Sequence, residues 1–184
     1  MPTLERVPAL TAPELLAAPV AAALAALPAD VAARIEAAPI DPDLADTAAF
    51  SEAYGFPLDG GANCIVVAGK RGEDVRFAAC VVLAHTRLDV NRVVRKLLDV
   101  RKASFAPMDQ AMELTGMEYG GITPIGLPSD WPVYVDSRVL DAPDAVIGAG
   151  RRGAKVFLPG TVLGALPGVQ VVEGLATEGL ATEA

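Results

Sequence analysis

The hydrophobic pattern of the chain changes period several times, which predicts a mixture of strands and helices. Residues 62–69 and 75–84 are mainly apolar runs with β-branched side chains, interrupted by Asn63 and Arg76, and the connecting GKRGED is typical of a hairpin turn. We therefore expect these two runs to form buried central strands. Shorter strands are predicted over 101–106, 132–136, 144–150, 154–159 and 168–174.

Helical spacing appears between these strands. Asp89 is placed as an N-cap before an apolar stripe, while Pro107 and Gly116 are placed to open and close another helix, and Gly55 to end an earlier one. Helices are predicted over 41–55, 88–100, 107–116 and 160–166, after two short ones around Leu15–Leu27 and Val31–Ile35. The alternation predicts an α+β fold with a mixed, largely antiparallel β-sheet or barrel-like core flanked by helices.

Length and composition favour one domain with appendages. A chain of 184 residues with 52% hydrophobic residues can bury a substantial core. We expect a helical N-terminal extension over 1–40 that packs on a main domain at 41–173. The final residues, 174–184, repeat GLATE and predict a flexible tail, either frayed or helical.

Net charge is −8, which argues against non-specific coating of nucleic acid. The net negative charge lies in the two ends, which hold twelve acids and two Arg, whereas residues 62–155 hold thirteen Lys or Arg against eleven acids. A basic set lies in this middle part, with only Asp89 and Asp99 among it: Arg87, Arg92, Arg95, Lys96, Arg101 and Lys102. Such a set is usually a solvated helix face, and phosphate contact is the alternative.

Cysteine usage and the N-terminus indicate a cytoplasmic protein. Cys64 and Cys80 fall in predicted strands without metal-ligand or CxxC spacing, so buried reduced thiols are expected. The apolar run at 15–29 resembles the core of an export signal, but Glu5, Glu14 and Pro19 do not fit one. The run is also too short and interrupted to span a bilayer, so no membrane partner is expected.

Several common chemistries are disfavoured by the residues present. His85 is the only histidine and no HExxH or CxxC motif occurs, so neither a metal nor a cofactor is expected. Gly148, Gly150 and Gly153 spell GxGxxG, but the following segment predicts a strand rather than the long helix of a dinucleotide site. His85 itself ends a predicted strand, as either a solvated loop residue or part of a pocket rim.

A run of glycines and prolines at 113–128, ELTGMEYGGITPIGLP, predicts a shaped loop. Glycine allows positive φ and close backbone approach, while proline fixes φ, so the loop can present amide N–H groups. Those amides could cradle an anion or a carbonyl oxygen. The alternative is an ordinary connection between strands.

The order RKASFAP, LTGMEYGGITPIGLP, PVYVD and VIGAG, within residues 41–172, resembles the YbaK-like family of aminoacyl-tRNA deacylases. This family is related to the editing domain of bacterial prolyl-tRNA synthetases. The resemblance implies that Gly120–Pro124 lines a pocket for the aminoacyl end of tRNA, and that the turn at Gly148 and Gly150 forms another wall. It also matches Lys102 to a common family lysine.

One departure from the family pattern concerns the first core strand. Family members carry a lysine there that is tied to tRNA binding and activity, and the resemblance places Asn63 at that point. Asparagine can hydrogen-bond but supplies no charge. Another cation such as Lys102 or Lys155 takes over, or backbone donors and the substrate suffice, or the reaction is lost.

The resemblance implies trans-editing hydrolysis of mischarged aminoacyl-tRNA, with the tRNA acceptor end as partner and a synthetase as a further candidate. The expected catalytic residues are Gly120, Gly121, Thr123 and Asn63. The expected substrate-binding residues are Pro124, Lys102, Asp136, Gly148, Gly150 and His85. Two alternatives stay open: a non-catalytic paralogue that binds aminoacyl-tRNA or an aminoacyl-nucleotide, and an interaction protein acting through its N-terminus.

Overall fold

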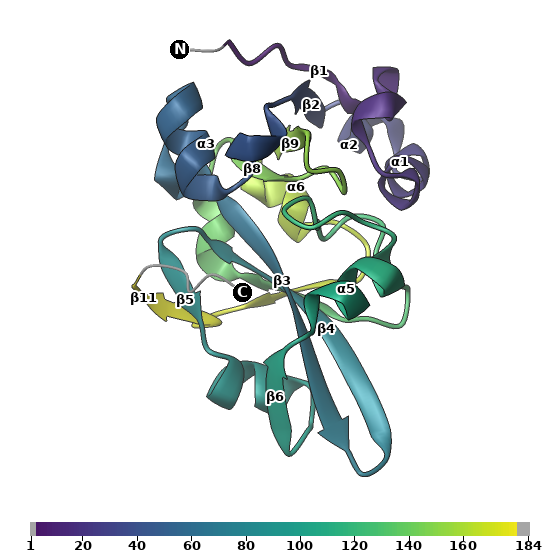
Figure 1. Cartoon of the computed structure of the whole chain (residues 1–184), viewed down its shortest axis with the longest axis vertical. Coiled ribbons are helices and arrows are strands. Elements are labelled where there is room, and N and C mark those ends of the chain that lie inside the picture. The colour runs from purple at the N-terminus through teal and green to yellow at the C-terminus, as the bar shows by residue number, and fades with distance from the viewer. Residues whose placement is uncertain (1–2, 180–184) are drawn as a thin grey trace.

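A long β-hairpin runs through the structure, a computed structural model that describes residues 3–179. Its strands, β3 (Ala62–Arg71) and β4 (Asp74–Leu83), pair antiparallel over their whole length and project to one end of the molecule (Figure 1). Gly72 supplies the positive φ of 64° at the turn. Both predicted central strands and their turn are therefore confirmed.

The hairpin lies inside a mixed five-stranded sheet of order β10-β7-β4-β3-β6. The added strands are β6 (Lys102–Phe105), β7 (Val133–Asp136) and β10 (Val169–Val172). β7 pairs parallel with both β4 and β10, whereas β3 pairs antiparallel with β4 and β6. Parallel pairing requires crossover connections, and these supply the helices that flank the sheet.

Two smaller sheets complete the strands. β1 (Val7–Pro8), β2 (Glu36–Pro39), β9 (Ala154–Leu158) and β8 (Ala145–Gly148) form an antiparallel sheet in that order. β5 (Thr86–Leu88) pairs with β11 (Ala176–Glu178). A parallel bridge between Gly61 and Val146 joins the start of β3 to β8. The fold class is thus α+β with mixed and antiparallel sheets flanked by helices, as predicted.

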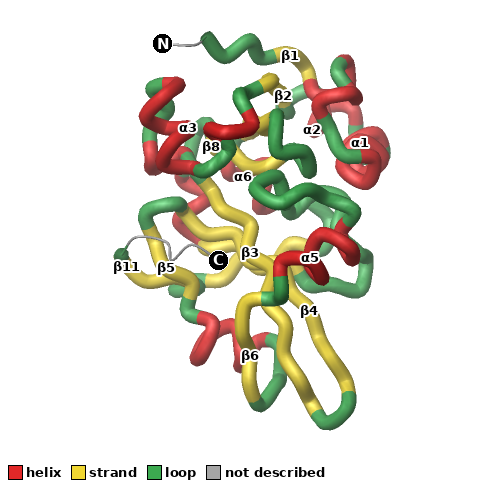
Figure 2. The backbone as a smooth tube through the Cα atoms, viewed as in Figure 1, coloured by secondary structure: helices red, strands yellow, loops and turns green. Residues whose placement is uncertain are grey.

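The helices are short and lie around the sheets (Figure 2). They are α1 (Ala18–Ala25), α2 (Ala29–Ala32), α3 (Thr47–Tyr54), α4 (Arg95–Leu97), α5 (Met108–Thr115) and α6 (Gly160–Gly164). Single 3₁₀ turns occur at η1 (Ala9–Thr11), η2 (Pro13–Leu15), η3 (Pro42–Leu44), η4 (Leu58–Gly60) and η6 (Ser137–Asp141). A π-helical turn, η5 (Val90–Val94), precedes α4.

Side chains at the helix ends behave largely as the sequence predicts. The Asp89 carboxylate accepts a hydrogen bond from the Arg92 amide at 3.0 Å, and Gly116 ends α5 with a φ of 67°. The helix predicted over 41–55 instead begins at Thr47, because Asp46 accepts the amides of Ala48 and Ala49. The predicted start at residue 41 is therefore wrong by six residues.

Four short strands were not predicted from the sequence, namely β1, β2, β5 and β11. β2 follows the second N-terminal helix and pairs with β9, so that Ala37 and Ala38 are fully buried. Alanine has low strand propensity, which is why EAAP was not predicted as a strand. The tail was expected to be frayed or helical from residue 174, whereas Ala176–Glu178 form β11; residues 180–184 of that prediction lie outside the described part.

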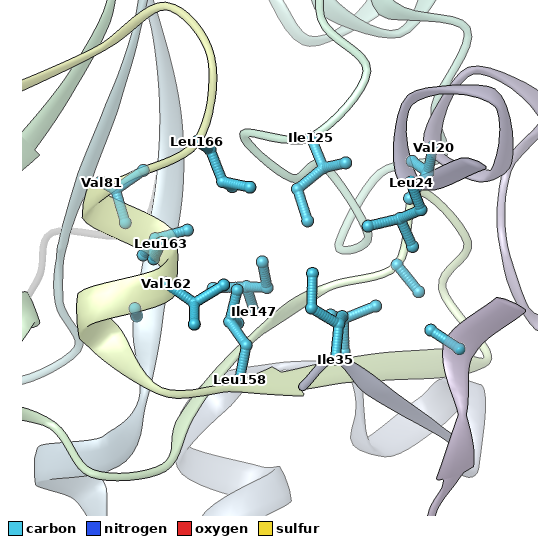
Figure 3. Close-up of a cluster of buried hydrophobic side chains, with 14 of the residues drawn as sticks. Val20, Leu24, Ile35, Val81, Ile125, Ile147, Leu158, Val162, Leu163 and Leu166 are labelled. Atoms are coloured by element: carbon cyan, nitrogen blue, oxygen red, sulfur yellow. The ribbon is translucent and has the colours of Figure 1, made fainter. Parts of the chain in front are cut away.

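The largest apolar cluster lies where the N-terminal helices, α6 and the glycine-rich loop meet. Figure 3 shows Val20 and Leu24 of α1 directed toward the same space as Ile125 of the loop and Leu163 of α6. Ile35, just before β2, is fully buried there too. Residues before position 41 therefore share the main core of the molecule.

The two cysteines are free thiols on opposite faces of the hairpin. Cys64 packs against the largest cluster, whereas Cys80 belongs to the cluster under β5 and η5. Burial raises the pKa of Cys64 to about 12 and that of Cys80 well above its ordinary value. Cys80 is buried and Cys64 is partly buried, so the expected burial is confirmed for Cys80, and the opposite faces explain why no disulfide joins these neighbouring strands.

Candidate functional site

The glycine-rich loop after α5 is fixed by its own buried side chains. Met117 and Ile125 insert into the largest cluster, and Trp131 stacks on Phe77 with ring centroids 5.0 Å apart. The segment between these anchors, from Glu118 to Pro124, is held in one shape although it contains no helix or strand. The prediction of a shaped loop is confirmed.

Two glycine segments far apart in the sequence press together, backbone against backbone. The Gly150 amide donates to the Gly121 carbonyl at 2.7 Å, and the Glu118 amide donates to the Gly150 carbonyl at 2.9 Å. A Cβ at Gly148 would lie 2.6 Å from both Gly121 C and Ile122 O, so only glycine fits there. We call Gly120, Gly121, Gly148 and Gly150 the glycine wall.

Backbone donors remain available beside this wall. The Gly121 amide is already bonded to the Glu118 carbonyl at 3.0 Å. The amides of Gly120, Ile122 and Thr123 have no hydrogen-bond partner within residues 3–179. The Thr123 hydroxyl is fully buried and is likewise without a partner among the described residues. A buried polar group in that state is one that a ligand or water satisfies.

The segment Ala45–Thr47 joins the glycine wall to β3 and β9. Thr47 Oγ1 donates to Asn63 Oδ1 at 2.6 Å, and Lys155 Nζ donates to the Ala45 carbonyl at 2.7 Å. A Cβ at Gly120 would lie 3.6 Å from the Ala45 Cβ. Asn63, Lys155 and Gly120 are therefore gathered around one short stretch of chain.

Lys155 is a buried cation at this meeting point. It lies opposite Gly148 in the register of β8 and β9, with only 7% of its surface exposed and Nζ 5.7 Å from the centre of the Phe50 ring. Burial lowers the pKa of Lys155 to about 8, with the nearby Asp46 acting against the shift and Arg152 adding to it. From the sequence, Lys155 is only one possible replacement cation, because its neighbours Ala45 and Phe50 lie more than a hundred residues away in the chain.

Asn63 approaches the wall from another side of β3. Side chains alternate along a strand, so Asn63 shares a face with Ile65, whereas Ile122 clusters with Val66 on the opposite face. Thr47 contacts Asn63 on its own face. The structure thus brings Gly120, Gly121 and Thr123 together directly, and connects Asn63 to them through Ala45–Thr47.

Asp136 is bonded elsewhere. It is 1% exposed and accepts hydrogen bonds from Arg138 and from the Ala176 amide, which lies 2.9 Å away. Although burial alone would raise it, these hydrogen bonds and the Arg138 charge hold the pKa of Asp136 below its ordinary value. Its carboxylate ties β7 to β11 and does not face the glycine wall.

The remaining predicted binding residues are dispersed. Pro124 is buried in the loop. Lys102 is exposed on β6 opposite Lys70, toward the far end of the hairpin. His85 is half-buried in the turn after β4, next to Ala84, whose amide donates to the Gly61 carbonyl at 2.8 Å. His85 therefore lies at the Asn63 end of β3, and Lys102 does not.

The part of the chain that the structure describes, residues 3–179, offers neither a metal cluster nor a membrane-spanning helix. No cluster of three or more His, Cys, Asp or Glu side chains is arranged there to hold a metal ion. No helix of that range is long and apolar enough to cross a membrane.

Comparison with known proteins defines the class of this site. A model described as the aminoacyl-tRNA editing domain matches residues 41–166, which is more than half of the chain. The chain belongs to this family, the YbaK-like editing domains, and the resemblance seen in its motifs is confirmed. The matched range contains the whole glycine wall and Asn63.

Individual relatives agree with the family. The proline–tRNA ligase of Listeria monocytogenes is 31% identical over 74 residues, which is 40% of this chain but only 13% of the ligase. The crystal structure of a proposed trans-editing enzyme for prolyl tRNA synthetase has a TM-score of 0.71 at 23% identity, covering 89% of this chain and 97% of that one. Hypothetical protein APE2540 gives 0.70 at 20% identity, covering 80% and 95%. The structural matches show the shared fold.

Proposed function

We propose that this protein hydrolyses the ester bond of mischarged aminoacyl-tRNA at the glycine wall. One observation carries the proposal: the unbonded amides of Gly120, Ile122 and Thr123 lie next to a buried Thr123 hydroxyl without a partner among the described residues. Preorganised N–H donors of this kind stabilise an oxyanion. Membership of the editing-domain family supplies the substrate class.

The reaction needs no nucleophilic side chain. A water adds to the ester carbonyl, and the negative charge that develops on its oxygen is stabilised by loop amides. The Thr123 hydroxyl orients the water, a role limited to positioning. The bond to the terminal ribose oxygen then breaks and that oxygen takes up a proton, releasing the amino acid and the uncharged tRNA.

A hydrolytic site is useful because binding alone discriminates poorly among small amino acids. One methylene is worth roughly 1 to 3 kcal/mol in a pocket, so a synthetase that charges the wrong amino acid needs a second sieve. The relatives named for proline–tRNA ligase and for prolyl tRNA synthetase make tRNA(Pro) the first substrate to test. We place the activity in the cytoplasm, where charged tRNA is used, with a synthetase as a candidate partner.

Lys155 supplies positive charge close to the wall in place of the lysine that Asn63 replaces. Its ammonium group lies 2.7 Å from the Ala45 carbonyl, which is beside Gly120. A buried charge acts through a low local dielectric, so its field reaches the wall without direct contact. Lys155 is in this proposal a positioning and electrostatic residue.

The decisive experiment is a deacylation assay with the purified chain. A panel of tRNAs mischarged with small amino acids, beginning with tRNA(Pro), is incubated with and without protein, and ester loss is followed over time. Hydrolysis well above the uncatalysed rate for at least one member is expected. Rates equal to the background for the whole panel would refute the proposal.

A substitution at residue 63 tests the missing charge. Asn63→Lys is expected to raise the deacylation rate if charge at that point limits it, because the ammonium would add to the field of Lys155. Asn63→Met is the control, since it has similar length and no charge. Equal rates for the two variants would show that the charge is irrelevant.

A second candidate is a non-catalytic module that binds aminoacyl-tRNA or an aminoacyl-nucleotide. Two observations favour it: Asn63 stands where the family lysine is expected, and Lys155 Nζ is already bonded to a carbonyl. The module would bind a non-hydrolysable aminoacyl-adenosine analogue and leave every charged tRNA intact. The panel assay and a binding titration together separate the two candidates.

A further inference from the structure

A hollow of about 440 Å³ opens between β5, η5 and β6, away from the glycine wall. In Figure 1, β6 lies beside the β3–β4 hairpin in the lower part of the view, and β5 lies higher, at the left. We call it the basic hollow, and its lining includes Arg87, Asn91, Arg92, Ser104, Phe105 and Thr177. None of these residues belongs to the site described above.

The charge around the basic hollow is positive, opposite in sign to the net charge of the chain. Its lining holds Arg87 and Arg92 against Asp89, and the segment 87–102, part of which lines it, carries six Lys or Arg and two acids, whereas the whole chain carries −8. Both acids are already paired, Asp89 with Arg92 at 2.9 Å and Asp99 with Arg71 and Arg76. Arg87 is exposed, and its guanidinium has no partner within residues 3–179. A local excess of cations with a free guanidinium favours a polyanion.

The hollow also presents an aromatic ring. Phe105 lies on the edge strand β6 with 37% of its surface exposed, above a floor that includes Leu88 and Val90. An exposed aromatic ring beside arginine is the combination that holds single-stranded nucleic acid, because the ring stacks on a base and the cation contacts phosphate. A small inorganic anion would not use the Phe105 ring, so the ring favours a ligand that carries bases.

The basic hollow lies on the same face of β3 as Asn63. Asn63, Ile65 and Val67 share this face by strand alternation, and Phe105 on β6 is opposite Val67. Four residues of strand separate Asn63 from Val67, which is about 13 Å. The hollow therefore lies on the Asn63 side of β3, where Val67 and Val82 are fully buried under β5 and η5.

We propose that the basic hollow is a binding site for unpaired RNA, in which a base stacks on Phe105 and the adjoining phosphate contacts Arg87. The inference rests on the proposed function for its choice of RNA as the polyanion, and it extends recognition beyond the reacting ester. RNA contact here gives affinity without taking part in hydrolysis.

The test is fluorescence anisotropy of a labelled single-stranded RNA oligonucleotide with the full chain. Phe105→Ala is expected to weaken binding about tenfold through the lost stacking. Arg87→Gln is expected to weaken it several-fold and to lower the slope of log affinity against log salt by about 0.7, the value for one phosphate contact on a single strand. Thermal unfolding of each variant checks that these exposed positions leave the fold intact.

Matched controls lie on other surfaces. Arg34→Gln removes an exposed cation before β2, and Val171→Ala truncates a 45% exposed side chain on the opposite edge strand, β10. Neither is expected to change RNA affinity. Equal binding by the wild type and both hollow variants overturns the proposal, as does no binding by the wild type. Equal displacement by an acidic polypeptide, with Phe105→Ala unchanged, shows a plain charge effect and also overturns it.

The outcome can be separated from that of the proposed function. If no charged tRNA is hydrolysed but RNA binding falls in both hollow variants, RNA binding in the hollow is supported and hydrolysis is refuted. If hydrolysis occurs and both variants keep the wild-type KM for charged tRNA, RNA binding in the hollow is refuted and hydrolysis is supported. A raised KM with unchanged kcat supports both.

Discussion

The glycine wall and the basic hollow, the two proposed ligand sites, are built in opposite ways. The wall is made of backbone, and its shape depends on residues that have no side chain, such as Gly121 and Gly148. The hollow is made of exposed side chains, such as Arg87 and Phe105, on the edge strands β5 and β6, each of which pairs with one neighbour. Chemistry that must place a reacting atom within fractions of an ångström is suited to the rigid wall, while adaptable side chains suit a sequence-tolerant strand of RNA.

This difference has a consequence for substitution. An added atom at Gly121 or Gly148 meets backbone that cannot move away, whereas a truncated side chain in the hollow leaves the strands intact. Damage to the wall should therefore appear in stability and activity together. Damage to the hollow should appear in RNA affinity alone.

The largest expected effect is at Gly148. Gly148→Ala places a methyl group 2.6 Å from Gly121 C and Ile122 O, which is expected to destabilise the fold by about 3 kcal/mol and to abolish deacylation. Gly153→Ala in the same turn is the control, because its nearest neighbours would be 3.5 and 3.8 Å away. Urea unfolding and the panel assay measure both. Similar behaviour of the two variants would contradict a backbone-built wall.

Lys155 should make stability depend on pH in the alkaline range. Its pKa is about 8 in the folded protein against an ordinary 10.5, so the unfolded chain holds more protons between these values and stability rises with pH. The rise is at most about 3 kcal/mol for this group. Lys155→Met should lack it, and the exposed Lys96→Met should keep it, when urea midpoints are compared from about pH 7.5 to about pH 10.5. Parallel curves for Lys155→Met and wild type would refute the buried charge.

Asp136 supports the hollow side of the molecule. Asp136→Asn weakens the bonds to Arg138 and Ala176, which is expected to destabilise the fold by about 2 kcal/mol and to loosen β11, where Thr177 lines the hollow. Because the folded pKa is lowered, the wild-type advantage is present above the ordinary value of 3.8 and is lost as pH falls through the folded value. Exposed Asp130→Asn is the control. If the stability difference between wild type and Asp136→Asn is the same at neutral and at acid pH, this account is contradicted.

The smallest expected change in stability is at Thr123. Thr123→Val removes a buried hydroxyl that has no partner within residues 3–179, so the free energy of unfolding should change by less than about 0.5 kcal/mol. If the hydroxyl orients the attacking water, the deacylation rate should still fall about tenfold. Thr161→Val, at an exposed position on α6, should change neither quantity. A rate equal to wild type for Thr123→Val would remove this residue from the mechanism.

Local signals predicted much of the fold. Asp89 as a cap, Gly116 as a helix end and the hairpin around Gly72 all depend on a few neighbouring residues, and the structure confirms them. The glycine-rich loop is equally predictable from the sequence, because its glycines and prolines restrict the backbone directly. The family followed from the order of these local motifs.

Features that depend on distant partners could not be predicted in the same way. The strand EAAP at Glu36–Pro39 exists because β9 is there to pair with it. Lys155 differs from the other lysines in its burial and its bond to the Ala45 carbonyl. Asp136 differs from the other acids in its bonds to Arg138 and to the Ala176 amide. Fold topology sets these contacts, so a sequence pattern within one segment carries no trace of them.

The pairing of β2 with β9 also bears on how the protein is made. Ala37 and Val156 are opposite each other in the sheet, yet a ribosome completes the first of them long before the second. The N-terminal helices and β2 therefore emerge without the strand they pair with, while the β3–β4 hairpin can form from neighbouring residues alone. We expect nascent chains that stop short of β9 to expose the apolar residues Val20, Leu24 and Ile35, and to be bound by chaperones until β9 is synthesised.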